Sequence, residues 1–361
     1  MQLRIPGPTP IPDEILKALS KQMIGHRGPQ FTEIVRRVTE NLRDIFQTEG
    51  DIFILTSSGT GGMEAAIVNT LSPGDKVLSV ANGAFGDRFA DIAETFGAEL
   101  ERLRFEWGTA ADPQEVRKAL SKDAGVKAVL VTHNETSTGV TNDLESISAV
   151  VREYDKLLIV DAISSLGAIN LPVDRWGCDV VVTGSQKAWM SPPGLAMVSV
   201  SERAWKAHAK AKMPRFYWDF TKFKKSLDKL QTPFTPAVSM FYALDTALEL
   251  FQREGLQNIF TRHARIAAKT RDEVKSLGLS LFADERYASN AVTAIKATKG
   301  LDSKLLLKIL REEYDTVLAG GQQRLDGQIF RIGHVGYVSE QDIDAVVTAL
   351  KAALPKAGFS G

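Results

Sequence analysis

A lysine and an aspartate stand directly after two strongly apolar segments of this 361-residue sequence. Asp161 ends the run "LLIVD", and Lys187 follows the run "VVVTG" by three positions. A buried carboxylate is costly unless it meets a positive partner, so one interpretation is a buried Asp161–Lys187 salt bridge. In the second interpretation, both side chains bind one cofactor, an aldehyde-bearing pyridine. Lys187 would then attach to the aldehyde as a Schiff base, and Asp161 would keep the ring nitrogen protonated.

Three further apolar runs end in residues that suit the same cofactor. The run "DIFIL" leads into the turn "TSSGTGG", which opens a helix, and the N-terminus of a helix suits a phosphate. This turn matches neither "GxGxxG" nor "GxxxxGK[ST]", which argues against a nucleotide site. Phe85 would stack on a planar ring, or would simply fill the core. Thr136 would hydrogen-bond a ring hydroxyl, or would belong to a plain turn.

These residues need a common scaffold, and the spacing of apolar residues predicts one. Short apolar runs indicate buried strands at 51–55, 76–81, 127–132, 156–162, 179–184 and 195–200. Helical spacing lies between them, at 31–45, 61–71, 85–97, 113–120 and 144–154. The alternation predicts an α/β fold with a mainly parallel sheet, in which ligands bind beyond the carboxyl ends of the strands.

The pattern changes after residue 201. Residues 204–235 are basic, aromatic and irregular, and long helices follow near 239–254 and 259–277. The remaining part predicts strands at 291–297 and 328–334 and amphipathic helices near 302–314 and 339–352. We therefore predict a large α/β domain at 16–250. The second, smaller α+β domain would comprise 251–361 together with the N-terminal arm 1–15.

The composition excludes several other classes of protein. Hydrophobic residues make up 44% and charged residues 24%, and the formal net charge is zero. A neutral chain lacks the positive surplus that general binders of nucleic acids or anionic membranes need. The single cysteine, Cys178, allows neither an intrachain disulfide nor a cysteine cluster for a metal. Because the start of the sequence has no apolar signal core and no segment is long enough to span a membrane, we expect a cytoplasmic protein.

Taken in order, six motifs resemble those of the class V aminotransferases. They are "SSGTGGMEAA", "ANGAFGDR", "THNETSTGV", "VDAISSLGA", "GSQKAWMSPPG" and "FRIGHVG". These aminotransferases are fold-type-I enzymes that use pyridoxal 5′-phosphate (PLP). The resemblance covers nearly the whole chain and is strongest for the alanine–glyoxylate and serine–pyruvate aminotransferase branch. It implies a large domain with a mainly parallel sheet and a small α+β C-terminal domain.

The resemblance also implies roles for individual residues. Lys187 and Asp161 would be catalytic, and both would bind PLP. The other implied cofactor contacts are Ser58, Gly59, Thr60, Phe85, Thr136, Ser165, Gln186, Thr232 and Thr235. Arg331 would hold the substrate α-carboxylate, with Gly7 and His26 also at the substrate, and no metal is implied. Thr235 and Thr232 would reach the phosphate in the neighbouring subunit of a homodimer with shared active sites.

The substrate preference is predicted from the number of positively charged side chains available for substrate carboxylates. Arg331 accounts for the carboxylate that every α-amino acid carries, and a dicarboxylic donor would need a second cation, for which Arg27 is the candidate. We therefore predict a small donor, alanine or serine, with glyoxylate or pyruvate as the acceptor. Three alternatives stay open: an aspartate-type donor, a PLP lyase on the same fold, and a non-enzymatic protein with a structural Asp161–Lys187 pair. A desulfurase is disfavoured because Cys178 does not lie on a C-terminal loop.

Overall fold

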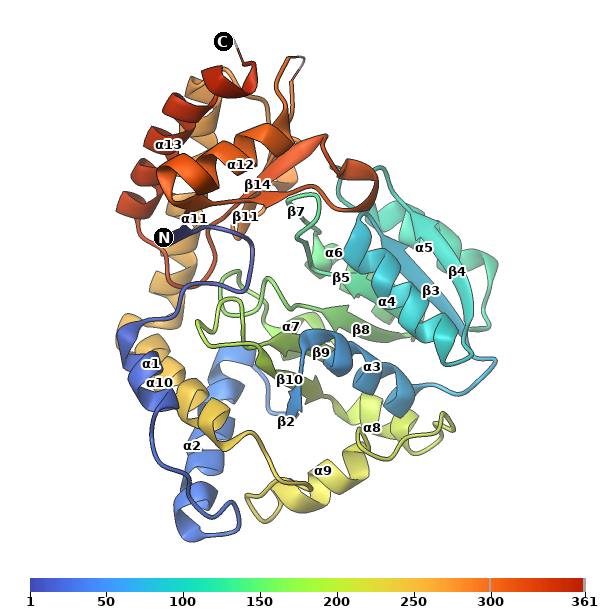
Figure 1. Cartoon of the computed structure of the whole chain (residues 1–361). Coiled ribbons are helices and arrows are strands. Elements are labelled where there is room, and N and C mark those ends of the chain that lie inside the picture. Colours follow the sequence, from blue (N-terminus) through green and yellow to red (C-terminus); the bar gives the residue numbers. More distant parts are fainter. Residues whose placement is uncertain (299, 360–361) are drawn as a thin grey trace.

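A seven-stranded sheet organises the larger part of the molecule (Figure 1). The computed structural model describes residues 1–298 and 300–359. The strand order is β2-β10-β9-β8-β5-β3-β4. The strands span β2 Asp51–Ser57, β3 Lys76–Ala81, β4 Glu99–Arg104, β5 Val126–Thr132, β8 Leu157–Asp161, β9 Val180–Gly184 and β10 Gly194–Val200. Only β10 runs antiparallel to its neighbours, so the predicted mainly parallel sheet is confirmed.

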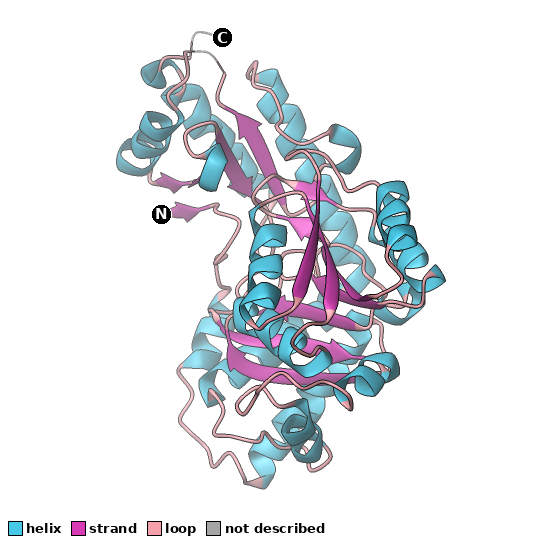
Figure 2. Ribbon diagram, turned by 90° about the vertical axis from the view of Figure 1, so that its right-hand side faces the viewer, coloured by secondary structure: helices cyan, strands magenta, loops and turns pink. Residues whose placement is uncertain are grey.

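Helices cover both faces of this sheet (Figure 2). Alternate residues of β2 show why both faces need cover: Ile52 and Ile54 pack into one apolar cluster, Phe53 and Leu55 into another. The first cluster includes side chains of α2, α5, α6 and α10, and the second includes side chains of α3, α4, α8 and α9. These helices span α2 Pro29–Phe46, α3 Gly59–Thr70, α4 Ala84–Thr95, α5 Pro113–Lys122, α6 Leu144–Glu153, α8 Glu202–His208, α9 Phe220–Leu227 and α10 Val238–Glu254.

Two segments differ from the sequence prediction. Strand β4 is not among the predicted strands. Its sequence, "ELERLR", is mostly charged, and none of its side chains is fully buried, because β4 lies at the edge of the sheet. Residues 204–235 contain the short helices α8 and α9, where an irregular segment was expected. Each of these two helices begins at a side-chain cap, Ser201 for α8 and Asp219 for α9. Caps of this kind are local and leave little trace in the spacing of apolar residues.

A second sheet, of three antiparallel strands, lies in the C-terminal part of the chain. Its order is β11-β14-β13, with β11 Val292–Lys296, β13 Ala319–Gly320 and β14 Ile329–Gly333. A separate apolar cluster joins it to α11 Leu256–Ser276, α12 Ser303–Tyr314 and α13 Glu340–Ala353. Gly255, at φ 83°, separates α10 from α11. The division of the chain into domains near residue 250 stays a prediction.

The first residues of the chain belong spatially to this C-terminal part. Strand β1 (Gln2–Leu3) pairs in parallel with β12 (Thr316–Val317), and Arg4 forms an ion pair with Asp342. The chain then crosses to α1 (Asp13–Leu19), which packs against α10. The N-terminal arm therefore runs from the small sheet to the large one.

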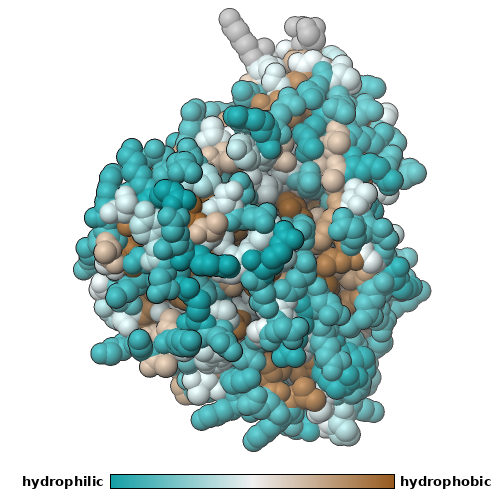
Figure 3. Space-filling model, turned by 180° about the vertical axis from the view of Figure 1, so that it is seen from behind, coloured by the Kyte–Doolittle hydropathy of each residue, from teal (hydrophilic) through white to brown (hydrophobic). Residues whose placement is uncertain are grey.

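The remaining elements are short. They are the strands β6 Asn134–Glu135 and β7 Val140–Thr141, the helix α7 Val173–Trp176, and the 3-10 turns Glu285–Tyr287, Gln323–Leu325 and Pro355–Ala357. Seen from behind, the molecule presents mostly hydrophilic side chains, with hydrophobic ones in patches between them (Figure 3). None of the helices formed by the described residues is long and apolar enough to cross a membrane.

Candidate active site

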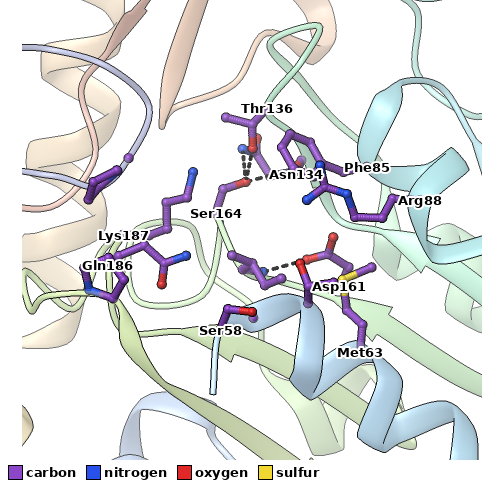
Figure 4. Close-up of a pocket in the computed structure, with 16 residues that line it drawn as sticks. Ser58, Met63, Phe85, Arg88, Asn134, Thr136, Asp161, Ser164, Gln186 and Lys187 are labelled. Atoms are coloured by element: carbon purple, nitrogen blue, oxygen red, sulfur yellow. Dashed lines mark hydrogen bonds between the residues drawn. The ribbon is translucent and has the colours of Figure 1, made fainter. Parts of the chain in front are cut away.

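A cavity of about 260 Å³ lies at the carboxyl ends of the large sheet (Figure 4). Nine residues predicted from the sequence line it: Gly7, Ser58, Gly59, Thr60, Phe85, Thr136, Asp161, Gln186 and Lys187. Seven lining residues were not predicted: Pro8, Met63, Arg88, Asn134, Ile163, Ser164 and Pro193. The strand ends therefore meet at one place, as expected for parallel strands.

Asp161 is the last residue of β8 and is only 3% exposed. Its Oδ1 accepts a hydrogen bond from the backbone N–H of Ile163 at 2.9 Å. Among the described residues, no cation forms an ion pair with it. Burial raises the pKa of the Asp161 carboxyl to about 7, because few groups compensate its charge. A positively charged ligand would lower that pKa again and would be held by the carboxylate.

Lys187 lies in the turn after β9 and reaches the cavity from another side than Asp161 (Figure 4). Its Nζ donates to the carbonyl of Pro6 at 2.7 Å and forms no ion pair with Asp161, so the direct salt bridge of the first interpretation is not formed. Burial, with Arg331 nearby, lowers the pKa of the Lys187 amine to about 8. About a tenth of the amine is then neutral, and therefore nucleophilic, at pH 7, far more than for an ordinary lysine.

Gly7 explains how the arm can lie against this lysine. It has φ +138°, and a Cβ at this position would lie 2.6 Å from the Lys187 Cδ. A side chain at residue 7 would therefore strain the backbone and also collide with the lysine. Thr9 adds a second link, because its Oγ1 donates to the Lys187 carbonyl at 3.0 Å.

The start of α3 is a second feature of the cavity. Its N-cap residue, Ser58, makes no side-chain capping hydrogen bond, so the first N–H groups of the helix stay available to an anion. Beside them, the buried Gln186 Oε1 has no hydrogen-bond partner among the described residues. Amide oxygen and nitrogen positions are interchangeable by rotation, so the Gln186 amide can equally present its NH₂ to a phosphate.

Phe85 and the β6 region form the opposite wall. Phe85 lies in the first turn of α4, and the Arg88 guanidinium lies 4.8 Å from the centre of its ring. The Thr136 hydroxyl donates to Ser164 Oγ at 2.8 Å, and the Asn134 amide donates to the same atom at 2.9 Å. The ring is thus presented to the cavity opposite a small polar network.

Two residues of this region depart from the expected set. Ser165 is fully buried and does not line the cavity, whereas its neighbour Ser164 does. Arg88 was missed although its spacing from Phe85, three residues along a helix, places both side chains on one face. That spacing is the signal from which it could have been predicted.

Arg331 lies in β14, 5% exposed, next to the cavity without lining it. Its Nε and Nη2 donate to the carbonyl of Gly320 at 3.0 and 2.7 Å, and its Nη1 donates to the carbonyl of Thr136 at 3.0 Å. Burial lowers the pKa of this guanidinium to about 10. No carboxylate of the described residues pairs with it, so its charge is free for an anionic ligand.

Four predicted residues lie away from the cavity of this chain. His26 and Thr232 do not line it, and Thr235 is exposed to solvent. Arg27 donates to the carbonyls of Thr232 and Pro233, so its guanidinium serves that loop.

The residues present fit an aldehyde-bearing pyridine with a phosphate. The uncompensated Asp161 suits a ring cation, the start of α3 and the Gln186 amide suit a phosphate, and the Lys187 amine suits an aldehyde. Among the described residues, no group of three or more His, Cys, Asp or Glu side chains is placed to hold a metal ion.

Comparison with known proteins agrees with a site for such a cofactor. A family model described as "Aminotransferase class-V" matches residues 3–346. "Soluble hydrogenase, small subunit" of Synechococcus is 47% identical, over 99% of this chain and 94% of that protein. The "L-aspartate--glyoxylate aminotransferase" of Paracoccus denitrificans is 38% identical, over 93% and 86%. Other relatives, 34 to 37% identical, are named serine–glyoxylate aminotransferases.

A solved structure is similar in the same way. The crystal structure of an alanine–glyoxylate aminotransferase from Nostoc superposes with a TM-score of 0.94 at 30% identity, covering 98% of this chain and 95% of that one.

Proposed function

The chain belongs to the class V aminotransferases, which are PLP-dependent, and on this basis we propose that it moves an amino group from alanine or serine to glyoxylate or pyruvate. One observation carries the proposal: Asp161 ends β8, Lys187 follows the adjacent strand β9, and the two side chains line one cavity, both buried without pairing with each other. A structural pair would share one ion pair. Two separate buried charges instead require a ligand that meets both.

We propose that PLP is held by the residues that line the cavity. When bound, PLP supplies an aldehyde carbon and an electron-accepting ring. Asp161 would hold the ring nitrogen, Phe85 would cover one ring face, and the start of α3 with Gln186 would bind the phosphate. The Lys187 Nζ would carry the cofactor and, when free, would take the proton from the substrate Cα. The Pro6 carbonyl, which accepts from this Nζ, would keep the freed amine at the cavity.

Arg331 is proposed to bind the α-carboxylate of the substrate. Its guanidinium is buried, fixed by two backbone carbonyls and unpaired with any described carboxylate. A planar guanidinium held in this way matches a carboxylate bidentately. Gly7 and Pro8, which line the cavity beside Arg331, would form the wall next to the bound substrate.

An aspartate donor is the second candidate, and Arg88 is the observation that favours it. Arg88 lines the cavity, and its guanidinium makes no hydrogen bond or ion pair with the described residues. The test is kcat/KM for alanine, serine, aspartate and glutamate with glyoxylate as acceptor. A preference for aspartate or glutamate of more than about tenfold, or about 1.4 kcal/mol, would contradict the small-donor proposal. Arg88→Gln should then remove that preference.

The proposed assembly is a homodimer with shared active sites. Thr235 is exposed and lies outside the cavity of its own chain. Its neighbour Phe234 stacks on Tyr217 and also contacts Phe216 at a tilt. Phe216 is 72% exposed, which is unusual for a large aromatic residue. Light scattering over a dilution series tests the proposal: a monomer with full activity would contradict it. The cytoplasm is the proposed compartment, supported by the single, buried Cys178.

A further inference from the structure

Glu135 is a buried charge to which the proposed reaction assigns no role. It lies in β6, is 0% exposed, and does not line the cavity. A buried carboxylate is expensive unless hydrogen bonds or cations compensate it. The groups that compensate this carboxylate therefore indicate what it does.

The Glu135 carboxylate binds the start of α4. Its Oε2 accepts from the backbone N–H groups of Phe85 and Gly86, both at 3.0 Å. Its Oε1 accepts from the N–H and the hydroxyl of Ser137, at 3.0 and 2.6 Å. The Ser137 Oγ in turn accepts from the N–H of Ala84 at 3.0 Å. Three successive N–H groups that a helix start leaves unpaired are thus bound by residues of another segment.

Gly83 shows how closely the carboxylate is fitted. A Cβ on Gly83 would lie 2.3 Å from both Cγ and Cδ of Glu135. The φ of Gly83 is 177°, an extended value open to any residue. Space for the carboxylate, and not backbone conformation, therefore requires glycine at position 83.

The capped turn carries the aromatic wall of the cavity. Phe85, whose N–H is bound by Glu135, is only half-buried and has no aromatic neighbour among the described residues to fix its ring. Apart from the Arg88 guanidinium, 4.8 Å from its centre, the ring depends for its position on the backbone of the first turn of α4, which Glu135 and Ser137 hold.

The charge of Glu135 also reaches the other site residues. Burial raises the pKa of the Glu135 carboxyl, but its four hydrogen bonds, three of them from backbone N–H groups that can only donate, favour the ionised form. Its negative charge favours the protonated forms of Asp161 and Arg331. The next residue, Thr136, accepts directly from Arg331. Lys187 and Arg88 are the other charged groups around the cavity.

We propose that Glu135 is a positioning residue of the aminotransferase: it caps α4 so that Phe85 faces the PLP ring, and it supplies a buried negative charge to the site. The inference rests on the proposed function, because the ring that Phe85 would cover is that of the proposed cofactor, PLP. It predicts two separable effects, one of geometry and one of charge.

Two variants separate these effects. Glu135→Gln removes the charge and replaces one accepting oxygen with an NH₂ group that faces donors, whereas Gly83→Ala keeps the charge and displaces the carboxylate. The matched control is Asp302→Asn, because Asp302 also caps two N–H groups, those of Lys304 and Leu305 at the start of α12, away from the cavity. The measurements are the near-visible circular dichroism of bound PLP, the Kd for PLP, and the pH midpoint of the PLP absorption band.

Both site variants should lose more than half of the dichroism per bound PLP. Their Kd should rise by up to about tenfold, the range of an aromatic stacking contact, while the control stays within about twofold of the wild type. Glu135→Gln alone should lower the pH midpoint by roughly half to one unit, because a nearby negative charge stabilises a protonated base. Site variants that match Asp302→Asn in dichroism and Kd would overturn the inference.

A variant that fails to fold does not end the test. Ser137→Ala keeps the carboxylate and removes only the hydroxyl that binds Ala84 N–H, so it should show the same loss of dichroism to a smaller extent. An unchanged spectrum and Kd in that variant would overturn the inference. A wild-type protein that binds no PLP would instead overturn the proposed function.

Discussion

The two ends of the large sheet each carry a cavity, and they differ in how their charges are satisfied. The cavity at the carboxyl ends has a volume of about 260 Å³, and the one at the amino ends, lined by Cys178, Asp179 and Arg203, is larger, at about 340 Å³. Asp179 is as buried as Asp161. However, it accepts from the Leu158 N–H and the Ser201 hydroxyl, both at 2.9 Å, and pairs with Arg203.

This difference separates a site from a structural cluster better than size does. At the amino ends the buried carboxylate is satisfied by the protein itself. At the carboxyl ends, Asp161 has one backbone donor, Lys187 has one backbone acceptor, and no ion pair joins them. An uncompensated buried charge destabilises the protein without ligand. A ligand of opposite charge relieves this cost, and its binding is favoured by the same amount.

The largest expected effect is at Lys187. Lys187→Ala should fold, because the side chain fills no apolar core, but it should lose the absorption band of lysine-bound PLP. Turnover should fall by at least 10²–10⁴-fold, roughly the range of an acid–base group alone. Spectra and single-turnover kinetics measure both. Substantial transamination by this variant would mean that the lysine is only structural.

Asp161→Asn should have opposite effects on the free and the PLP-bound protein. The folded pKa, about 7, lies above the usual value of 3.8, so the folded free protein holds its proton more tightly than the unfolded chain does. Its stability therefore falls as pH rises from about 4 to 7. At pH 8 the Asn variant without PLP should melt higher than the wild type, by the order of 2–5 °C.

With PLP bound, the order of melting temperatures should reverse, because the wild-type carboxylate then holds a ring cation. Calorimetry of both proteins, with and without PLP, checks this. If the Asn variant binds PLP as tightly as the wild type, Asp161 does not hold the ring nitrogen, and it would be a structural residue like Asp179.

The matching change at the other cavity should act on stability alone. In Asp179→Asn, an NH₂ group replaces one oxygen and faces the donors of Leu158 or Ser201, and the pair with Arg203 is lost. The expected loss is about 1–3 kcal/mol of unfolding free energy with unchanged kcat. Denaturant unfolding and steady-state rates measure the two quantities. A lowered kcat at equal folding would show that the two ends of the sheet are coupled.

The pH dependence of PLP capture sharpens the comparison further. The neutral Lys187 amine is the reactive form, and its pKa is about 8. The rate of band formation should therefore rise by roughly tenfold between pH 7 and 9 and then level off, whereas an ordinary lysine would keep gaining beyond pH 10. Stopped-flow absorbance follows this directly. A rate still rising steeply above pH 10 would mean that the amine is not desolvated.

The smallest effect is expected at Cys178. Burial raises the pKa of the Cys178 thiol and so makes it less reactive. In the cavity at the carboxyl ends, burial lowers the pKa of the Lys187 amine and makes it more reactive. The thiol should label with iodoacetamide only after unfolding. Cys178→Ala should bind PLP like the wild type, and altered PLP binding would again indicate coupling across the sheet.

Much of the fold follows from the sequence because most of its elements have apolar faces. All six predicted strands of the large sheet form, since each is an apolar run buried on both faces. The polar edge strand β4 and the capped helices α8 and α9 lack that signal. Strand ends bring Asp161, Lys187 and Phe85 together, as the parallel arrangement predicts.

The neighbours of these residues were harder to predict. Arg88 and Ser164 enter the cavity through side-chain direction, which residue types alone do not determine. Nothing in the residue types singles out Glu135, and only its hydrogen bonds to the start of α4 reveal its position. The roles assigned to Thr232, Thr235 and His26 stay predictions, because these residues lie away from the cavity of the single chain.

The contacts of the N-terminal arm determine when, during synthesis, this arm can fold into place. Gln2 donates to the carbonyl of Asp342, and Thr9 donates to the carbonyl of Lys187, so these two residues find partners 340 and 178 positions later in the chain. Until residues 316 and 317 have left the ribosome, Gln2 and Leu3 have no strand to pair with, and Pro6 is not held over Lys187. We therefore expect the reactive lysine to stay uncovered while the intervening residues are translated, and to be enclosed only after residues 316–342 have been synthesised.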